Sequence, residues 1–168
     1  TLGFGAVSGT GALSATGTQL VTIIDDDLAG VTVTQSGGST NVTEGGATDT
    51  YTLVLSSQPT ANVVITLNSG TQLTTAPNSV SFTSANWNTP QTVTVTAVDD
   101  AIAEGNHSGA ITHTVSSTDA VYNGIGVANV VVNISDNEVP GVTVTPTAGL
   151  VTTEAGGTAT FTVVLNTQ

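Results

Sequence analysis

The feature that most restricts how this chain of 168 residues can fold is a long internal repeat. The later copy of each matching segment lies roughly 110 positions after the first, with one residue deleted on the way. The matching segments are 25–34 with 136–145, 42–46 with 152–156, and 51–58 with 161–168. A period of this length exceeds that of small solenoid repeats and is typical of a string of sandwich domains.

The repeat divides the chain into three parts. We predict the C-terminal strands of one repeat over 1–27, a complete repeat over 28–138, and the N-terminal strands of a following repeat over 139–168. The chain starts at Thr1 rather than Met, and it contains no apolar run of the ~18–20 residues that a transmembrane helix needs. We therefore interpret it as a window from a longer chain.

The strands of the complete repeat are predicted from the alternation of Val, Ile and Leu with Thr and Ser at a period of two. The predicted strands are 31–35, 48–56, 62–67, 79–83, 91–98, 109–116 and 127–134. Short strands separated by Gly, Asn, Ser and Pro predict an all-β, seven-stranded antiparallel β-sandwich of immunoglobulin-like type. Tyr51, Phe82 and Trp87 are the expected large core side chains, and a turn near 84–88 is the one helical expectation.

The charge of the chain is unusually one-sided. Lysine and arginine are absent, and twelve acidic residues give a formal net charge of −12. Nucleic acids and anionic membrane surfaces both need a basic partner, so we expect no nucleic-acid partner and no direct membrane insertion. Cysteine is absent too, so no disulfide stabilises the fold. Each carboxylate must therefore face water, accept hydrogen bonds or bind a metal ion.

Acidic residues gather in segments that a sandwich topology brings to one end. The turn after the first strand, the loop after the fifth strand and the end of the last strand all lie at that end. Their carboxylates are those of Glu44, Asp99, Asp100, Glu104, Asp136 and Glu138. Mutual repulsion, oxygen-only donors and a loop setting favour Ca²⁺, which takes ~6–8 oxygen ligands at flexible geometry. The alternative is that these are solvated loop acids.

Three motifs resemble the Calx-β repeat, which regulates sodium–calcium exchangers and recurs in large bacterial surface proteins. The motifs are VTEGG at 42–46, VDD at 98–100 followed by Glu104, and IIDDDLAG at 23–30. The resemblance covers the whole chain as one full and two partial repeats. It implies a Calx-β-like sandwich in which the same six carboxylates bind Ca²⁺. It also implies that Asp25, Asp26 and Asp27 serve the Ca²⁺ site of the preceding repeat.

The sequence departs from the Calx-β pattern in two places. The loop at 68–70 reads NSG and has no acid where exchanger domains carry one, and the terminal acidic run at 136–138 reads DNE rather than three aspartates. The resemblance therefore implies fewer or weaker Ca²⁺ ions than in the exchanger sensor. Glu154 corresponds to Glu44 in the third repeat.

Catalytic motifs are absent from the sequence. His107 follows Glu104 in a loop, and His113 alternates within a predicted strand as a packed or polar-face residue. Neither histidine has a zinc-site spacing with the acids. His107, Ser108 and Asp100 are neighbours in a loop without a nucleophile elbow or oxyanion motif, so we predict that the chain is not an enzyme.

The function predicted from these features is mechanical. We predict a structural or adhesive repeat module of a long extracellular surface or filament protein, in which Ca²⁺ at the junctions fixes the angle between neighbouring repeats. Its partners would be the neighbouring repeats, and like chains in a filament or a surface glycan or protein. The alternatives are a glycan- or protein-binding sandwich module and a calcium-sensing regulatory domain.

Overall fold

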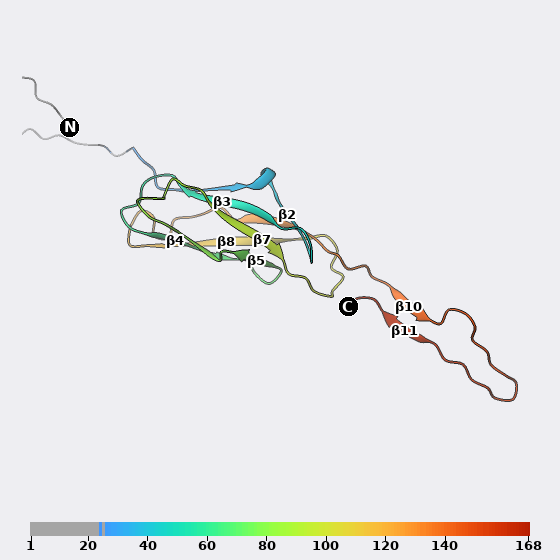
Figure 1. Ribbon diagram of the computed structural model, residues 1–168. Helices are drawn as coiled ribbons and strands as arrows, with labels where there is room; N and C mark the ends of the chain where they lie inside the picture. Colours follow the sequence, from blue (N-terminus) through green and yellow to red (C-terminus); the bar gives the residue numbers. More distant parts are fainter. Residues whose placement is uncertain (1–23, 25) are drawn as a thin grey trace, which may run out of the picture.

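The computed structural model describes residue 24 and residues 26–168, and it contains two β-sheets that pack face to face (Figure 1). The first sheet has the order β1 (Val31–Gln35), β3 (Asp49–Leu55), β7 (Gln91–Ala97) and β5 (Leu73–Ala76). The second sheet has the order β2 (Thr40–Thr43), β9 (Val130–Ser135), β8 (His107–Ser117), β4 (Val63–Asn68) and β6 (Ser79–Phe82). A single 3-10 turn, η1 (Ser36–Gly38), is the one helical element among the described residues, and none of their helices could cross a membrane. The predicted all-β sandwich is confirmed.

The core lies between the sheets because apolar and polar residues alternate along the strands. In β3 the side chains of Tyr51, Leu53 and Leu55 are buried, while the residues between them are partly exposed. Each buried apolar side chain of this size stabilises the fold by about 1.5–3 kcal/mol. Tyr51 and Phe82 are fully buried and Trp87 packs against the core, as predicted.

Tyr122 is a core residue that the alternation did not reveal, because it lies in the loop between β8 and β9. Its hydroxyl donates to the carbonyl oxygen of Ser57 over 2.6 Å and accepts the backbone N–H of Ser57 over 3.1 Å. A buried hydroxyl without partners costs about 1–3 kcal/mol, so these bonds allow a polar ring to fill the core at the end where β3 finishes.

Two strands of the sandwich were not predicted. β2 and β5 have four residues each, which is too short for alternation to be recognised. β1 and β2 belong to different sheets, and the chain crosses between them at η1, where Gly37 and Gly38 have φ values of 61° and 86°. β2 then pairs parallel with β9, so the sandwich is not purely antiparallel as expected.

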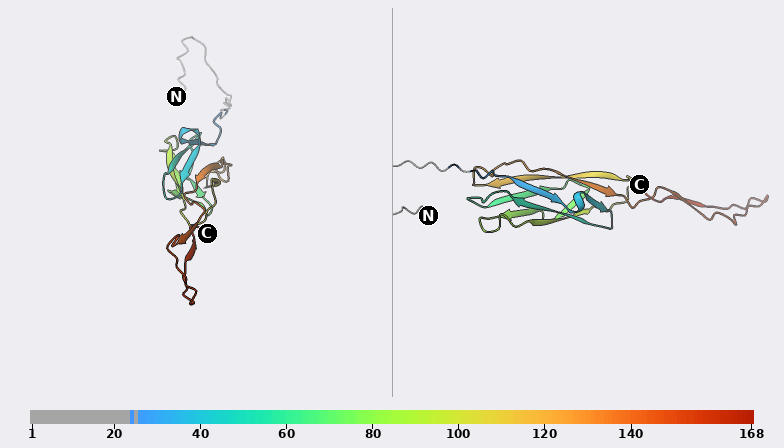
Figure 2. Two further views of the ribbon diagram at one scale, coloured as in Figure 1. Left: turned by 90° about the vertical axis from the view of Figure 1, so that its right-hand side faces the viewer. Right: turned by 90° about the horizontal axis from the view of Figure 1, so that it is seen from above.

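A separate hairpin follows the sandwich and is formed by β10 (Val142–Thr145) and β11 (Thr162–Leu165). It projects from one end of the sandwich (Figures 1 and 2). The side chains of both strands are exposed, in contrast to the half-buried pattern of β3.

The hairpin has the same register as the pair β1–β3. Val31 pairs with Leu55 in the sandwich, and Val142 pairs with Leu165 in the hairpin; these are corresponding positions of the sequence repeat. The repeated sequence therefore forms the same local pairing twice. The division of the chain into one full and two partial repeats stays a prediction.

Candidate metal centre

The parallel pairing of β2 with β9 brings two acidic segments together. The strands run in the same direction and end side by side, with Thr43 opposite Ser135. The pairing continues one step further, since the backbone N–H of Glu44 donates to the carbonyl oxygen of Ser135 over 3.0 Å. Glu44 therefore lies beside residues 136–138, which follow β9 directly.

The loop after β7 supplies the third acidic segment at this end. β7 is antiparallel to β3, so β7 ends where β3 begins, just after the turn that holds Glu44. The backbone N–H of Gly105 in this loop donates to the Asp136 carboxylate, and the Asn137 side-chain amide donates to Asp99 Oδ1 over 3.1 Å. The three acidic segments thus meet at one end of the sandwich, as the topology argument expected. Their binding of a metal ion stays a prediction.

Glu44, Asp136 and Glu138, which we call the carboxylate cluster, form the inner part of this end. One carboxylate oxygen from each lies within 4.8 Å of the other two. Glu44 is only 3% exposed. Burial raises the pKa of Glu44, and the negative charges of Asp136 and Asp100 raise it further, against a hydrogen bond from the backbone of Asp100 and the nearby His107.

The other two members of the carboxylate cluster are coupled to each other. A side-chain hydrogen bond with Asp136, followed by burial and neighbouring negative charge, raises the pKa of Glu138 to about 7. The pKa of Asp136 is lowered instead, because the backbone N–H groups of Glu138 and Gly105 donate to its carboxylate. Glu138 and Glu44 therefore lose their protons less readily in the folded protein than free glutamate side chains do.

The carboxylate cluster fits a hard divalent cation such as Ca²⁺. All of its donors are oxygens, which hard cations prefer. Glu44 Oε2 and Glu138 Oε2 are buried and have no hydrogen-bond partner among the described residues. Unpaired buried carboxylate oxygens are costly, and the chain has no Lys or Arg to pair with them, so a cation bound by these residues would remove the cost.

Asp99 and Asp100 lie next to the carboxylate cluster without joining its set of close oxygens. Asp99 is exposed and accepts the amide of Asn137, while Asp100 Oδ1 accepts the backbone N–H of Ile102 over 2.7 Å. Gly45 is packed against Asp99, because a Cβ at this glycine would lie 3.1 Å from Asp99 Oδ2. These two aspartates are therefore peripheral among the six predicted ligands.

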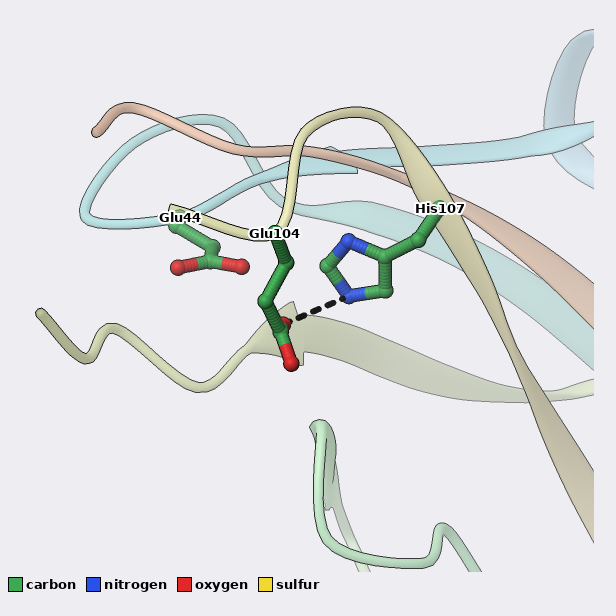
Figure 3. Close-up of side chains that lie close together, drawn as sticks. All are labelled: Glu44, Glu104 and His107. Atoms are coloured by element: carbon green, nitrogen blue, oxygen red, sulfur yellow. Dashed lines mark ion pairs between the residues drawn. The ribbon is translucent and has the colours of Figure 1, made fainter. Parts of the chain in front are cut away.

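Glu104 lies near a residue that the sequence analysis did not place in a site. One ligand atom each of Glu44, Glu104 and His107, which we call the histidine cluster, lie within 4.8 Å of one another (Figure 3). Sequence reasoning set His107 aside because no zinc-type spacing links it to the acids. The one local signal was its position three residues after Glu104.

Of the acidic run at 25–27, the described residues Asp26 and Asp27 do not join either cluster. Asp25 lies outside the described residues, whereas Asp26 and Asp27 are exposed in the segment that leads into β1. This segment is at the opposite end of the sandwich, because β1 begins opposite Leu55, where β3 ends. Its predicted role at the site of a preceding repeat stays a prediction.

Comparisons with known proteins found similar chains among solved structures. No protein-family model and no curated protein match the sequence. Among solved structures, the apo form of the Calx CBD1 domain is similar at 17% identity with a TM-score of 0.45, over 64% of this chain and 98% of that one. SSP-19, an MSP-domain-like protein of Caenorhabditis elegans, is similar at 14% identity with a TM-score of 0.41, over 62% and 99%. PapD-like domain 7 of human CEP192 is similar at 12% identity with a TM-score of 0.45, over 74% and 97%.

Proposed function

We propose that this chain is a Ca²⁺-binding β-sandwich module of a longer extracellular surface protein, and that it acts mechanically rather than as an enzyme. The bound ion would hold the sandwich to the segment that follows it. The observation that supports this proposal is the position of the carboxylate cluster, whose member Glu138 lies four residues before the start of β10 at Val142.

The acidic loop after β7 links the cluster to the hairpin. The backbone N–H of Gln168, just after β11, donates to the carbonyl oxygen of Ala101 over 2.9 Å. The carbonyl oxygen of Gln168 accepts the N–H of Ala103 over 3.2 Å. The same loop donates to the carboxylate cluster through Gly105. A cation that orders the cluster would therefore also order the junction between sandwich and hairpin.

The mechanical effect follows from charge. Without a cation, the carboxylates of Glu44, Asp136 and Glu138 repel one another at the junction. Ca²⁺ that binds the folded form alone stabilises it by about 2.7 kcal/mol at a free concentration of about 100 times Kd. Weak oxygen sites of extracellular modules bind Ca²⁺ with Kd of roughly 10⁻⁴–10⁻³ M, and we expect an affinity in this range. The neighbouring repeats of the same chain would be the primary partners.

The proposal is tested by thermal unfolding and small-angle X-ray scattering of the full chain in EGTA and in saturating Ca²⁺, with Mg²⁺ as the control cation. We expect Ca²⁺ to raise Tm by about 5–10 °C, from the stabilisation above and about 2–4 °C per kcal/mol for a chain of this size. We also expect a narrower distribution of molecular dimensions in Ca²⁺. Unchanged melting and unchanged dimensions would refute the proposal.

A further inference from the structure

The histidine cluster is assembled by the tertiary fold from separate parts of the chain. Glu44 lies in the turn after β2, Glu104 in the loop after β7, and His107 at the first position of β8. In Figure 3 the His107 ring faces the Glu104 carboxylate, and the Glu44 carboxylate lies beside them. The cluster shares Glu44 with the carboxylate cluster and adds a nitrogen donor that the carboxylate cluster lacks.

The hydrogen bond of His107 determines which ring nitrogen faces the carboxylates as an acceptor. His107 Nδ1 lies 2.8 Å from the carbonyl oxygen of Gly105. A carbonyl oxygen can only accept, so Nδ1 carries the hydrogen and donates it. In the neutral ring Nε2 is then left with its lone pair, which is the form that binds metals. Histidine ligands of metals typically donate their other N–H to a carbonyl oxygen or carboxylate in this way.

Two members of the histidine cluster, Glu44 and His107, each have a buried polar atom without an ordinary partner. His107 Nε2 and Glu44 Oε2 are both buried and have no hydrogen-bond partner among the described residues. Glu44 is almost completely buried, with an exposed fraction of 3%. A nitrogen lone pair and carboxylate oxygens are all acceptors, so they gain nothing from each other unless a cation lies between them.

The spacing of the donors agrees with a small metal ion. His107 Nε2 lies 3.4 Å from Glu104 Oε2. Two ligands of a tetrahedral Zn²⁺ ion at bond lengths of about 2.1 Å are separated by about 3.4 Å. The side-chain amide of Gln72 donates to the same Glu104 oxygen and restrains its position. Glu44 needs only a small movement, since all three ligand atoms already lie within 4.8 Å of one another.

From this geometry we propose that Glu44, Glu104 and His107 form a site for a borderline divalent metal ion of the Zn²⁺ type, joined to the carboxylate cluster through Glu44. An imidazole nitrogen with two carboxylates suits Zn²⁺ and its neighbours in the first transition row, whereas Ca²⁺ takes oxygen ligands. The inference of this site does not rest on the proposed Ca²⁺ binding. The competing explanation for the pair is a protonated His107 in an ion pair with Glu104, without any metal.

The test is a titration of the chelator-treated full chain with Zn²⁺ and, separately, with Co²⁺, whose visible absorption reports a nitrogen-containing site. Calorimetry should show one equivalent of Zn²⁺ bound by the wild type. We expect His107→Gln to weaken Zn²⁺ binding at least about tenfold and to leave the Ca²⁺-induced shift in Tm unchanged. His113→Gln, which removes the other histidine, and Ser108→Ala, which changes an exposed neighbour, are the matched controls and should bind Zn²⁺ as the wild type does.

A measurement on the wild type tests the proposal even if the variants fold poorly. Long-range ¹H–¹⁵N spectra should show Zn²⁺ shifting the Nε2 resonance of His107 and leaving that of His113 in place. The proposal is overturned if Zn²⁺ shifts His113 instead, if His107→Gln binds Zn²⁺ as the wild type does, or if the wild type binds no Zn²⁺. A chain that binds Zn²⁺ without Ca²⁺ overturns the proposed function alone, and a chain that binds Ca²⁺ without Zn²⁺ overturns this inference alone.

Discussion

The backbone N–H of Glu44 donates to the carbonyl oxygen of Ser135 over 3.0 Å, as the last step of the parallel pairing between β2 and β9. This bond holds the turn of Glu44 against the acidic run 136–138, which starts at the next residue. The cluster of Glu44, Asp136 and Glu138 therefore exists only while these two strands are paired. Cation binding and the pairing of β2 with β9 are expected to stabilise each other.

Glu44→Gln should abolish most of the stabilisation by Ca²⁺. The substitution keeps the shape of the side chain but removes the buried charge that both clusters share. At saturating Ca²⁺ the loss should approach the full stabilisation of about 2.7 kcal/mol. Differential scanning fluorimetry in EGTA and in Ca²⁺ measures it. The matched control is Glu154→Gln, at the corresponding repeat position in an exposed segment. Equal effects of the two substitutions would contradict the role given to Glu44.

Gly45→Ala should weaken Ca²⁺ binding, whereas Gly37→Ala should not. The two glycines have almost the same φ, 59° at Gly45 and 61° at Gly37. Either substitution should therefore lower the free energy of unfolding by about 1–2 kcal/mol through backbone strain alone. A Cβ at Gly45 would also crowd Asp99 Oδ2 at 3.1 Å, while one at Gly37 meets nothing within 4 Å. Calorimetric Ca²⁺ affinities of both variants separate the two effects, and similar affinities would argue against a site at this turn.

The ionisation of Glu138 should make the metal-free protein less stable as pH rises. Its pKa is about 7 in the folded protein, above the ordinary value of 4.5. Between these values the folded protein keeps a proton that the unfolded chain has released, so the contribution of Glu138 to stability is present at low pH and is lost as pH rises through about 7. Ca²⁺ competes with this proton and should reduce the loss.

Glu138→Gln isolates this contribution. Burial lowers the pKa of His113, so His113 makes the folded state more stable as pH rises through its ordinary value of 6.5, with the opposite sign. The useful quantity is therefore the free energy of unfolding of the wild type minus that of the variant, from urea titrations in EGTA between about pH 5 and about pH 7.5. This difference should decrease with pH. A constant or increasing difference would contradict the contribution assigned to Glu138.

Tyr122→Phe should destabilise the sandwich without changing its response to Ca²⁺. The substitution removes the hydroxyl that bonds the backbone N–H and the carbonyl oxygen of Ser57. Both backbone groups then lose this partner in a buried site. The expected cost is about 1–3 kcal/mol. Tyr51→Phe, which loses one bond of 3.0 Å to His113, should cost about 0.5–1.5 kcal/mol. Urea unfolding with and without Ca²⁺ measures both, and a Ca²⁺-dependent difference for Tyr122→Phe would be unexpected.

A fragment of residues 28–138 should fold by itself. All buried apolar side chains of the described residues lie between Val42 and Ile134, so the fragment keeps the entire core. The fragment loses two backbone hydrogen bonds to the hairpin, at Ala101, which is exposed, and at Ala103, which is partly exposed. We expect cooperative melting within a few degrees of the full chain, measured by circular dichroism. A fragment that does not fold would show that 1–27 or 139–168 belongs to the same structural unit.

Much of the fold and part of the site could be predicted because their causes are local in sequence. Alternating Val and Thr determine which side chains face the core, and this placed Tyr51 and Phe82 correctly. The absence of Lys and Arg left the acids without cationic partners, and the order of strands brought their three segments to one end. Four-residue strands such as β2 were missed because they carry too little pattern.

The residue pattern alone therefore predicts the class of the fold, the repetition of the segments that form β1 and β3, and the end of the sandwich where the acids meet. The tertiary structure alone decided which acids are buried together, because β2 crosses to the second sheet and pairs parallel with β9. It also decided that His107 faces Glu44, a residue 63 positions earlier in the chain. Ligand distances depend on the packing of segments far apart in sequence, and no spacing along the chain encodes them.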